Sequence, residues 1–238
     1  MTLVGDKREL KLFFDNLMQP LEGDEVYFIY MVARKKWDDN NTLTRSEEML
    51  DMKLLTEYDF GRFYRLLKRF EVPEECYVDI RTGAPIPDKT KGIYIDLVPK
   101  SVTRGLSNYF KEFIVDVYES KSDVNRLRRL RKWYRFAMGN IHKANARRRR
   151  FTIIDVDDKA LIQDVMSLIN EHNIPIYWIT KTRGGYHIFI ENKEWMRDFY
   201  RLVYPKLKKW ENVEVLKQNQ TPICGTYQGG FLVKCWRP

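Results

Sequence analysis

Three short segments in the last third of the chain carry side chains that could handle phosphate. The first is Asp155-Val156-Asp157, which directly follows the apolar run 151–154. Residues i and i+2 of an extended chain point to the same side. Asp155 and Asp157 could therefore share a hard cation such as Mg²⁺ or Mn²⁺, which prefers oxygen ligands. The alternative is an ordinary acidic loop in which Asp157 or Asp158 caps the next helix, because two acids at this spacing are a weak pattern.

The second segment is a glycine turn flanked by cations and followed by a histidine. It contains Lys181, Arg183, Gly184 and Gly185, and His187 lies just inside the next expected strand. Two glycines beside cations allow backbone N–H groups to approach an anion closely. The segment therefore suits a phosphate group, and an ordinary hairpin turn with a packed or exposed histidine is the alternative.

The third segment is the strand-like run 213–216, which contains Glu214. A single glutamate in a strand usually faces solvent, so its interest depends on the other two segments. Three glycines follow in the tail, together with Lys234. Lys234 could reach a phosphate, or the tail could simply be a bulged terminal hairpin.

The elements expected around these segments follow a β-α-β-β-α-β order, typical of a ferredoxin-like or RRM-like unit. The apolar patterns predict strands over 151–155, 174–180, 186–191 and 213–216, and helices over 159–172 and 195–210. In such a sheet the first and third strands are central neighbours and the fourth lies beside the first. Asp155, Asp157, His187 and Glu214 would then meet on one face. Three carboxylates with room for two cations are the arrangement that two-metal phosphoryl transfer requires.

The rest of the chain is expected to form two further parts of an α+β fold. Residues 1–102 form an N-terminal α/β module, with helices over 9–18 and 54–70, a helix starting at Ser46, and strands over 26–32 and 93–98. Residues 103–147 form a helical basic connector, and residues 148–238 form the RRM-like module. Together they make one domain.

Positive charge is concentrated in that connector. The 238-residue chain has a net charge of +9, and the segment 124–150 contains eleven Lys and Arg residues but no acid. The remainder therefore sums to −2. Such a patch usually meets phosphate, anionic lipid or an acidic partner. Without compensating acids, nucleic acid is favoured over a simply solvated helix face, and the expected contacts are Arg126, Arg128, Arg129, Arg131, Lys132, Arg135, Arg147, Arg148, Arg149 and Arg150.

Aromatic side chains accompany these cations. Trp133, Tyr134 and Phe136 could stack on bases, although the apolar stripe of the expected helix places Tyr134 inward. The run 34–37, Arg-Lys-Lys-Trp, is a smaller cluster of the same kind, either nucleic-acid binding or a solvated surface.

Composition excludes several other classes of protein. A hydrophobic fraction of 44% supports a core and rules out wholesale disorder. Three cysteines rule out a disulfide framework, and the spacing of Cys224 and Cys235 matches no zinc knuckle. No apolar run is long enough for a membrane span, and the first residues carry no signal-peptide core. We expect a reducing, intracellular setting without a membrane partner, such as the cytoplasm, the nucleoid or the replication site of a mobile element.

The three segments, in this order and spacing, resemble the three motifs of archaeo-eukaryotic primases and primase-polymerases over residues 151–236. A looser similarity extends to the run 94–100. The resemblance implies a template-directed nucleotidyltransferase that joins nucleotides to a 3′-hydroxyl. It further implies two Mg²⁺ or Mn²⁺ ions on Asp155, Asp157 and Glu214. The expected triphosphate ligands are His187, Arg183, Lys181, Gly184, Gly185 and Lys234.

The implied partners are nucleoside triphosphates and a DNA template, either single-stranded or a primer-template. No zinc module or helicase segment is evident, so a helicase or other replication proteins would come from another chain. One departure from the family pattern is Glu214, since the third motif usually ends in Asp. A non-catalytic RRM-like nucleic-acid-binding module with vestigial acids is therefore the alternative, and a metal-dependent nuclease is a third hypothesis.

Overall fold

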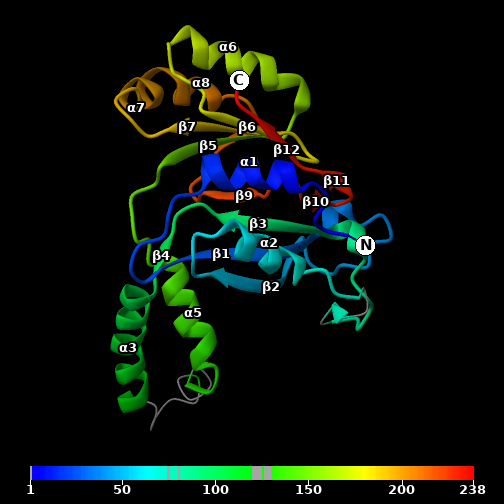
Figure 1. Cartoon of the computed structure of the whole chain (residues 1–238), viewed down its shortest axis with the longest axis vertical. Coiled ribbons are helices and arrows are strands. Elements are labelled where there is room, and N and C mark those ends of the chain that lie inside the picture. Colours follow the sequence, from blue (N-terminus) through cyan, green and yellow to red (C-terminus); the bar gives the residue numbers. More distant parts are fainter. Residues whose placement is uncertain (1, 74–75, 80, 120–124, 126–129) are drawn as a thin grey trace.

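The protein is an α+β structure with two antiparallel sheets, stacked along its long axis (Figure 1). It is described here from a computed structural model that covers residues 2–73, 76–79, 81–119, 125 and 130–238. Helices lie at both ends of the stack and along one side of it. The site discussed below forms where the two sheets face each other.

The first sheet has the strand order β2-β1-β3-β9, and β4 pairs with β1. Its strands are β1 (Glu25–Arg34), β2 (Glu47–Leu55), β3 (Lys91–Asp96), β4 (Lys100–Ser101) and β9 (Gln220–Pro222). β1 is buried along almost its whole length, as expected for the β-branched and aromatic run at its centre. β9 comes from the C-terminal third of the chain, so this sheet contains strands from both ends of the sequence.

The helix expected to start at Ser46 is wrong, because Glu47–Leu55 forms β2. β2 pairs with eight residues of β1, with a bulge between Met31 and Val32. Glu, Met, Leu and Lys favour helices only by tenths of a kcal/mol each, and the open edge of the buried strand β1 outweighs that preference. The following helix, α2 (Phe60–Lys68), therefore starts only after Asp59, whose side chain caps it by accepting a bond from Arg62 N.

The second sheet has the strand order β12-β6-β7-β5-β8. The strands are β5 (Phe151–Val156), β6 (Trp178–Lys181), β7 (Tyr186–Glu191), β8 (Val213–Val215) and β12 (Lys234–Trp236). The short strands β10 (Tyr227–Gln228) and β11 (Phe231–Leu232) pair separately. Between the strands lie η4 (Lys159–Leu161), α6 (Ile162–Glu171), α7 (Met196–Asp198), the π-helical turn η5 (Phe199–Val203) and α8 (Tyr204–Leu207).

The two faces of β5 serve different purposes. Ile154 and Val156 point into a core that they share with α6 and η5, through Val165 and Phe199. Alternate residues point the other way, so Phe151 belongs to the larger core that also contains the side chains of α1 (Lys7–Leu17) and of the first sheet. Asp155 continues this second face, and it therefore faces the first sheet.

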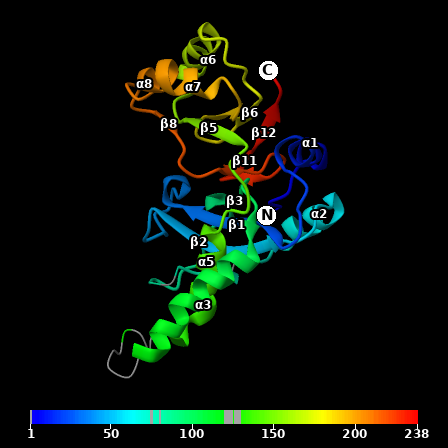
Figure 2. The same ribbon diagram turned by 90° about the vertical axis from the view of Figure 1, so that its left-hand side faces the viewer.

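Two helices extend away from this body (Figures 1 and 2). α3 (Val102–Glu119) and α5 (Trp133–Lys143) lie side by side as a hairpin that starts from the first sheet. Two short 3-10 turns, η1 (Lys35–Trp37) and η3 (Asp88–Thr90), complete the elements used below. None of the helices in the described part of the chain combines the length and apolar content that a membrane span requires.

Candidate functional site

A row of three ionisable side chains crosses the second sheet on the face that looks toward the first. Asp155 on β5 pairs directly with His187 of β7 on one side and with Glu214 of β8 on the other. Directly paired residues of antiparallel strands present their side chains to the same face, about 5 Å apart. The register therefore aligns an imidazole and two carboxylates drawn from three separate segments.

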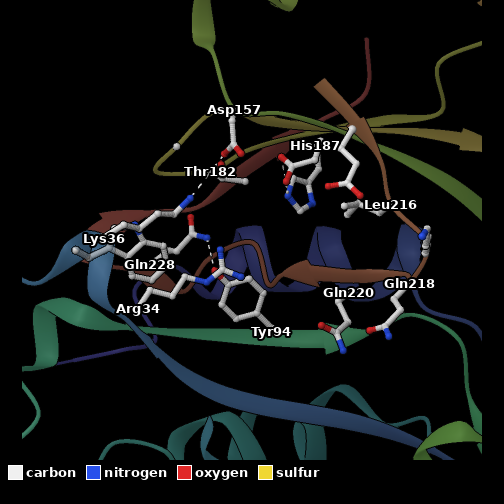
Figure 3. A pocket seen from close by; sticks show the side chains of 15 residues that line it. Arg34, Lys36, Tyr94, Asp157, Thr182, His187, Leu216, Gln218, Gln220 and Gln228 are labelled. Carbon is white, nitrogen blue, oxygen red and sulfur yellow. Dashed lines mark hydrogen bonds and ion pairs between the residues drawn. The ribbon is translucent and has the colours of Figure 1, made fainter. Parts of the chain in front are cut away.

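This row lines a cavity of about 320 Å³ between the two sheets. Asp157 and Gly184 also line it from the side of the second sheet, while Arg34, Lys36 and Tyr94 come from the first sheet and η1. Figure 3 shows His187 and Asp157 on one side of the cavity, with Arg34, Tyr94 and Gln220 opposite them. The volume falls within the usual range of a small-molecule site.

Burial changes the protonation of the central pair. His187 Nε2 lies 3.4 Å from Asp155 Oδ1, and its Nδ1 lies 3.1 Å from the Thr221 hydroxyl. Burial lowers the pKa of His187, despite the opposing effect of Asp155, so its imidazole is neutral at pH 7. Burial, together with the nearby charge of Asp157, raises the pKa of Asp155, which His187 partly offsets. A cation would relieve the cost of keeping this carboxylate ionised.

The opposite wall carries positive charge and hydrogen-bonding groups. Lys36 Nζ lies 3.7 Å from Asp157 Oδ1. The Arg34 guanidinium lies 4.9 Å from the centre of the Tyr94 ring and forms an ion pair with Glu47 at 2.9 Å. Burial raises the pKa of Tyr94 to about 12, so its hydroxyl stays protonated, and it accepts a hydrogen bond from Gln228 Nε2 at 2.6 Å. Acids on one wall and cations on the other suit a ligand that carries both phosphate and metal.

The glycine turn sits directly against the acidic segment. Gly185 N donates to the Thr182 hydroxyl at 3.0 Å, and Thr182 N donates back to the Gly185 carbonyl at 2.9 Å, which closes a tight hairpin between β6 and β7. A Cβ on Gly185 would overlap the carbonyl oxygen of Val156. This close approach explains the second glycine: the turn and the strand end that bears Asp157 are packed backbone to backbone.

Three of the side chains expected to hold a triphosphate lie elsewhere. The Arg183 guanidinium donates to the Gly229 carbonyl and lies over Trp37, 5.8 Å from its ring centre. Lys181 and Lys234 pair with each other across β6 and β12. Because Thr180 pairs with His187, the next residue, Lys181, must point to the opposite face of the sheet. The structure therefore does not bring Lys181 and Lys234 to the cavity.

The carboxylates suit a hard divalent cation in their chemistry. Asp155, Asp157 and Glu214 supply only oxygen ligands, which Mg²⁺ and Mn²⁺ prefer, and all three line one cavity. Asp155 lies within ion-pair distance of His187, and Asp157 lies within ion-pair distance of Lys36. Over the described ranges, no three His, Cys, Asp or Glu side chains are already set around a common point. The donor set fits such an ion. The capping alternative applies to Asp158, which accepts from Ala160 N at 2.9 Å.

The basic connector is distributed over several places. Arg126, Arg128 and Arg129 lie outside the described residues. Arg131, Lys132 and Arg135 are exposed near the far end of the α3–α5 hairpin. The expected inward position of Tyr134 is wrong, since this side chain is 51% exposed, as are Trp133 at 55% and Phe136 at 40%. The hairpin therefore presents cations and aromatic rings together, at a distance from the cavity.

The four consecutive arginines have different roles. Arg147 forms an ion pair with Glu25 at 2.5 Å, and Arg150 one with Glu191 at 3.0 Å. Arg150 also lies over the Phe151 and Tyr177 rings. Arg148 and Arg149 are exposed. Two of the four thus stabilise the connection between the sheets, and two remain available to a ligand.

Several residues of the cavity were not expected at the acidic site. Lys36 and Arg34 belong to a basic-aromatic cluster visible in the sequence, but nothing in a linear pattern places it opposite Asp155. Gln218 and Gln220 come from a polar run that follows β8 and leads into β9. No protein-family model, curated protein or solved structure matches this chain.

Proposed function

We propose that the protein is a template-directed nucleotidyltransferase of the primase-polymerase kind, acting at the cavity between the two sheets. The observation that carries this proposal is the row His187–Asp155–Glu214, which crosses three neighbouring strands and faces a cavity shared with Asp157. The three segments that resemble the primase motifs are separated by tens of residues in sequence. Their meeting in one cavity supports a common chemical task.

The topology of the second sheet supports the same proposal. Its first four strands in chain order occur spatially as β6-β7-β5-β8, and α6, η5 and α8 pack on one face. This is the order of a ferredoxin-like or RRM-like unit, in which the third and first strands are central. The opposite face, which packs on α1 and the first sheet, is the one that carries the acids. We propose one catalytic domain that also includes the first sheet, because that sheet supplies Arg34, Lys36 and Tyr94.

Each side chain then has a definable role. Asp155, Asp157 and Glu214 would hold two divalent cations, which when bound acidify an attacking 3′-hydroxyl and neutralise charge on the phosphate. Lys36 and Arg34, opposite the acids, would bind the triphosphate. His187, neutral at pH 7, would donate or accept a single hydrogen bond rather than add charge. Tyr94 and the glutamines would contact the base or sugar.

A gel assay with a labelled primer on a DNA template tests the proposal. With nucleoside triphosphates and Mn²⁺ or Mg²⁺, we expect the labelled strand to become longer. Shortening of the strand by metal alone would instead establish a nuclease. A third outcome is that the strand is bound while its length stays the same, whether or not an unlabelled initiating nucleotide is added. That result would establish the non-catalytic module.

Two neighbouring lysines provide a sharper prediction about the nucleotide. Lys36 lines the cavity and Lys35 does not, although both are exposed. A charge-assisted hydrogen bond contributes about 1.5–3 kcal/mol. We expect Lys36→Gln to raise KM for the nucleoside triphosphate by about tenfold or more, and Lys35→Gln to leave it within about twofold. Equal effects of the two substitutions on steady-state kinetics would remove Lys36 from the site.

A further inference from the structure

A second cavity, of about 210 Å³, lies where the α3–α5 hairpin joins the body. Its lining comes from the end of β3, from β4, from the last turn of α5, and from Arg149. Gln218 lines both this cavity and the acidic one. The two cavities are therefore neighbours, separated by the segment between β8 and β9.

The buried charge at the base of this second cavity is internally balanced. Lys100 Nζ lies 2.7 Å from Asp96 Oδ2, and the two residues are 3% and 4% exposed. Lys100 also donates to the side-chain oxygen of Asn145. Among the lining residues the acid is Asp96, and its negative charge is neutralised by the ion pair with Lys100.

The rim of the cavity carries uncompensated positive charge. Lys143 and Arg149 are exposed, and within the described ranges neither side chain takes part in an ion pair. His142 lies 2.7 Å from the Tyr30 hydroxyl, and burial lowers its pKa, so it adds no charge at pH 7. With Asp96 and Lys100 neutralising each other, the lining has a net charge of +2. An anion is the complementary ligand.

We propose that this cavity binds a backbone phosphodiester of the nucleic-acid strand that occupies the acidic cavity. The inference rests on the proposed function for the identity of the polymer, and on the charge and position of the cavity for the site itself. Lys143 and Arg149 supply the positive charge. Gln218 lines both cavities, so one strand can pass from the acidic cavity to the second cavity. Arg147 and Arg150 take no part, because Glu25 and Glu191 already hold them.

The salt dependence of binding tests this site directly. The probe is a fluorescein-labelled oligo(dT) of about 20 nucleotides with a 5′-hydroxyl, longer than common single-strand sites. Its affinity for the full chain is measured by anisotropy over a range of KCl, without metal or nucleotide. Each phosphate contact on a single strand contributes a slope of about −0.7 in log K against log [salt]. We expect Lys143→Gln/Arg149→Gln, which removes this one phosphate contact, to reduce the steepness by about 0.7 and to weaken binding several-fold at low salt.

A control with the same change in net charge is Lys208→Gln/Lys209→Gln, which lies beyond α8 on the helix-covered side of the second sheet. Its slope should match that of the unmodified protein. Equal slopes for all three proteins, or a wild type that does not bind the strand, would overturn the inference. If the double substitution changed the slope only for a 5′-phosphorylated strand, the bound group would be a terminal phosphate and not a backbone diester. That result would also overturn the inference. The proposed function is judged separately, by primer extension.

Discussion

Asp155→Asn should abolish nucleotidyl transfer while leaving the protein at least as stable as before. Asp155 is the centre of the row, with His187 on one side and Glu214 on the other. Asparagine keeps the shape but lacks the negative charge that holds a divalent cation. Metal-ion catalysis contributes several kcal/mol, and each 1.36 kcal/mol is a factor of ten, so we expect a rate loss of about 10³-fold or more in primer extension.

The direction of the change in stability caused by the same substitution can also be predicted. Burial raises the pKa of Asp155 in the folded protein. A carboxyl whose folded pKa exceeds its unfolded pKa stabilises the fold most when protonated, and that contribution is lost as pH rises through the folded pKa. In EDTA, Asp155→Asn should therefore have an unchanged or higher Tm at pH 7, and its relative advantage should shrink on acidification.

Glu171→Gln is the matched control for Asp155→Asn. Glu171 is exposed at the end of α6, on the helix-covered side of the second sheet, and the substitution changes the charge equally. It should retain primer extension at the unmodified rate. Full activity in Asp155→Asn, or comparable losses in both variants, would refute the role assigned to the row.

Gly185→Ala should destabilise the protein and disrupt the site, whereas Gly184→Ala should leave the stability of the protein nearly unchanged. A Cβ at Gly185 would overlap the backbone of Val156, and no side-chain rotation can relieve a clash between backbones. A Cβ at Gly184 would meet Asp157 Oδ1 at 3.2 Å and Lys36 Nζ at 4.0 Å, both at the ends of side chains that can turn away. Overpacking of a buried contact typically costs 1–3 kcal/mol, so we expect about that loss for Gly185→Ala.

Thermal unfolding followed by circular dichroism measures this difference between two adjacent glycines. Gly185→Ala should lower Tm by several degrees, with Gly184→Ala close to the unmodified protein. The site should respond as well, because moving the end of β5 shifts Asp157 away from Asp155. Equal melting temperatures for the two variants would show that the hairpin can move away from β5 at little cost.

The sequence alone indicated the local chemistry and most of the nearby elements. The apolar patterns of 151–155 and 186–191 placed Asp155 and His187 on strands, and the structure has β5 and β7 there. It also predicted that the last third contains helices on either side of a glycine hairpin. These features depend on neighbours in the chain, so periodicity and turn residues are sufficient to reveal them.

The strand register, and the wall of the cavity that faces the acids, depend on contacts between distant residues. The segment of β2 was expected to be helical because Ser46 followed by Glu47 and Glu48 is typical of a helix start, and only the open edge of β1 makes it a strand. The positions of Lys181 and Lys234 on the far face follow from the pairing of Thr180 with His187, since a shift by one residue would reverse both faces. Arg34 and Lys36 are more than a hundred residues from Asp155.

The run of four arginines shows the same division. Its sequence indicates only a concentrated positive charge, whereas the fold gives Arg147 and Arg150 carboxylate partners and leaves Arg149 beside a cavity. Composition determines how much charge a segment carries, because that is a sum over residues. Whether each charge is paired inside the protein or offered to a ligand is decided by which distant carboxylates the folded chain brings within a few ångströms of it.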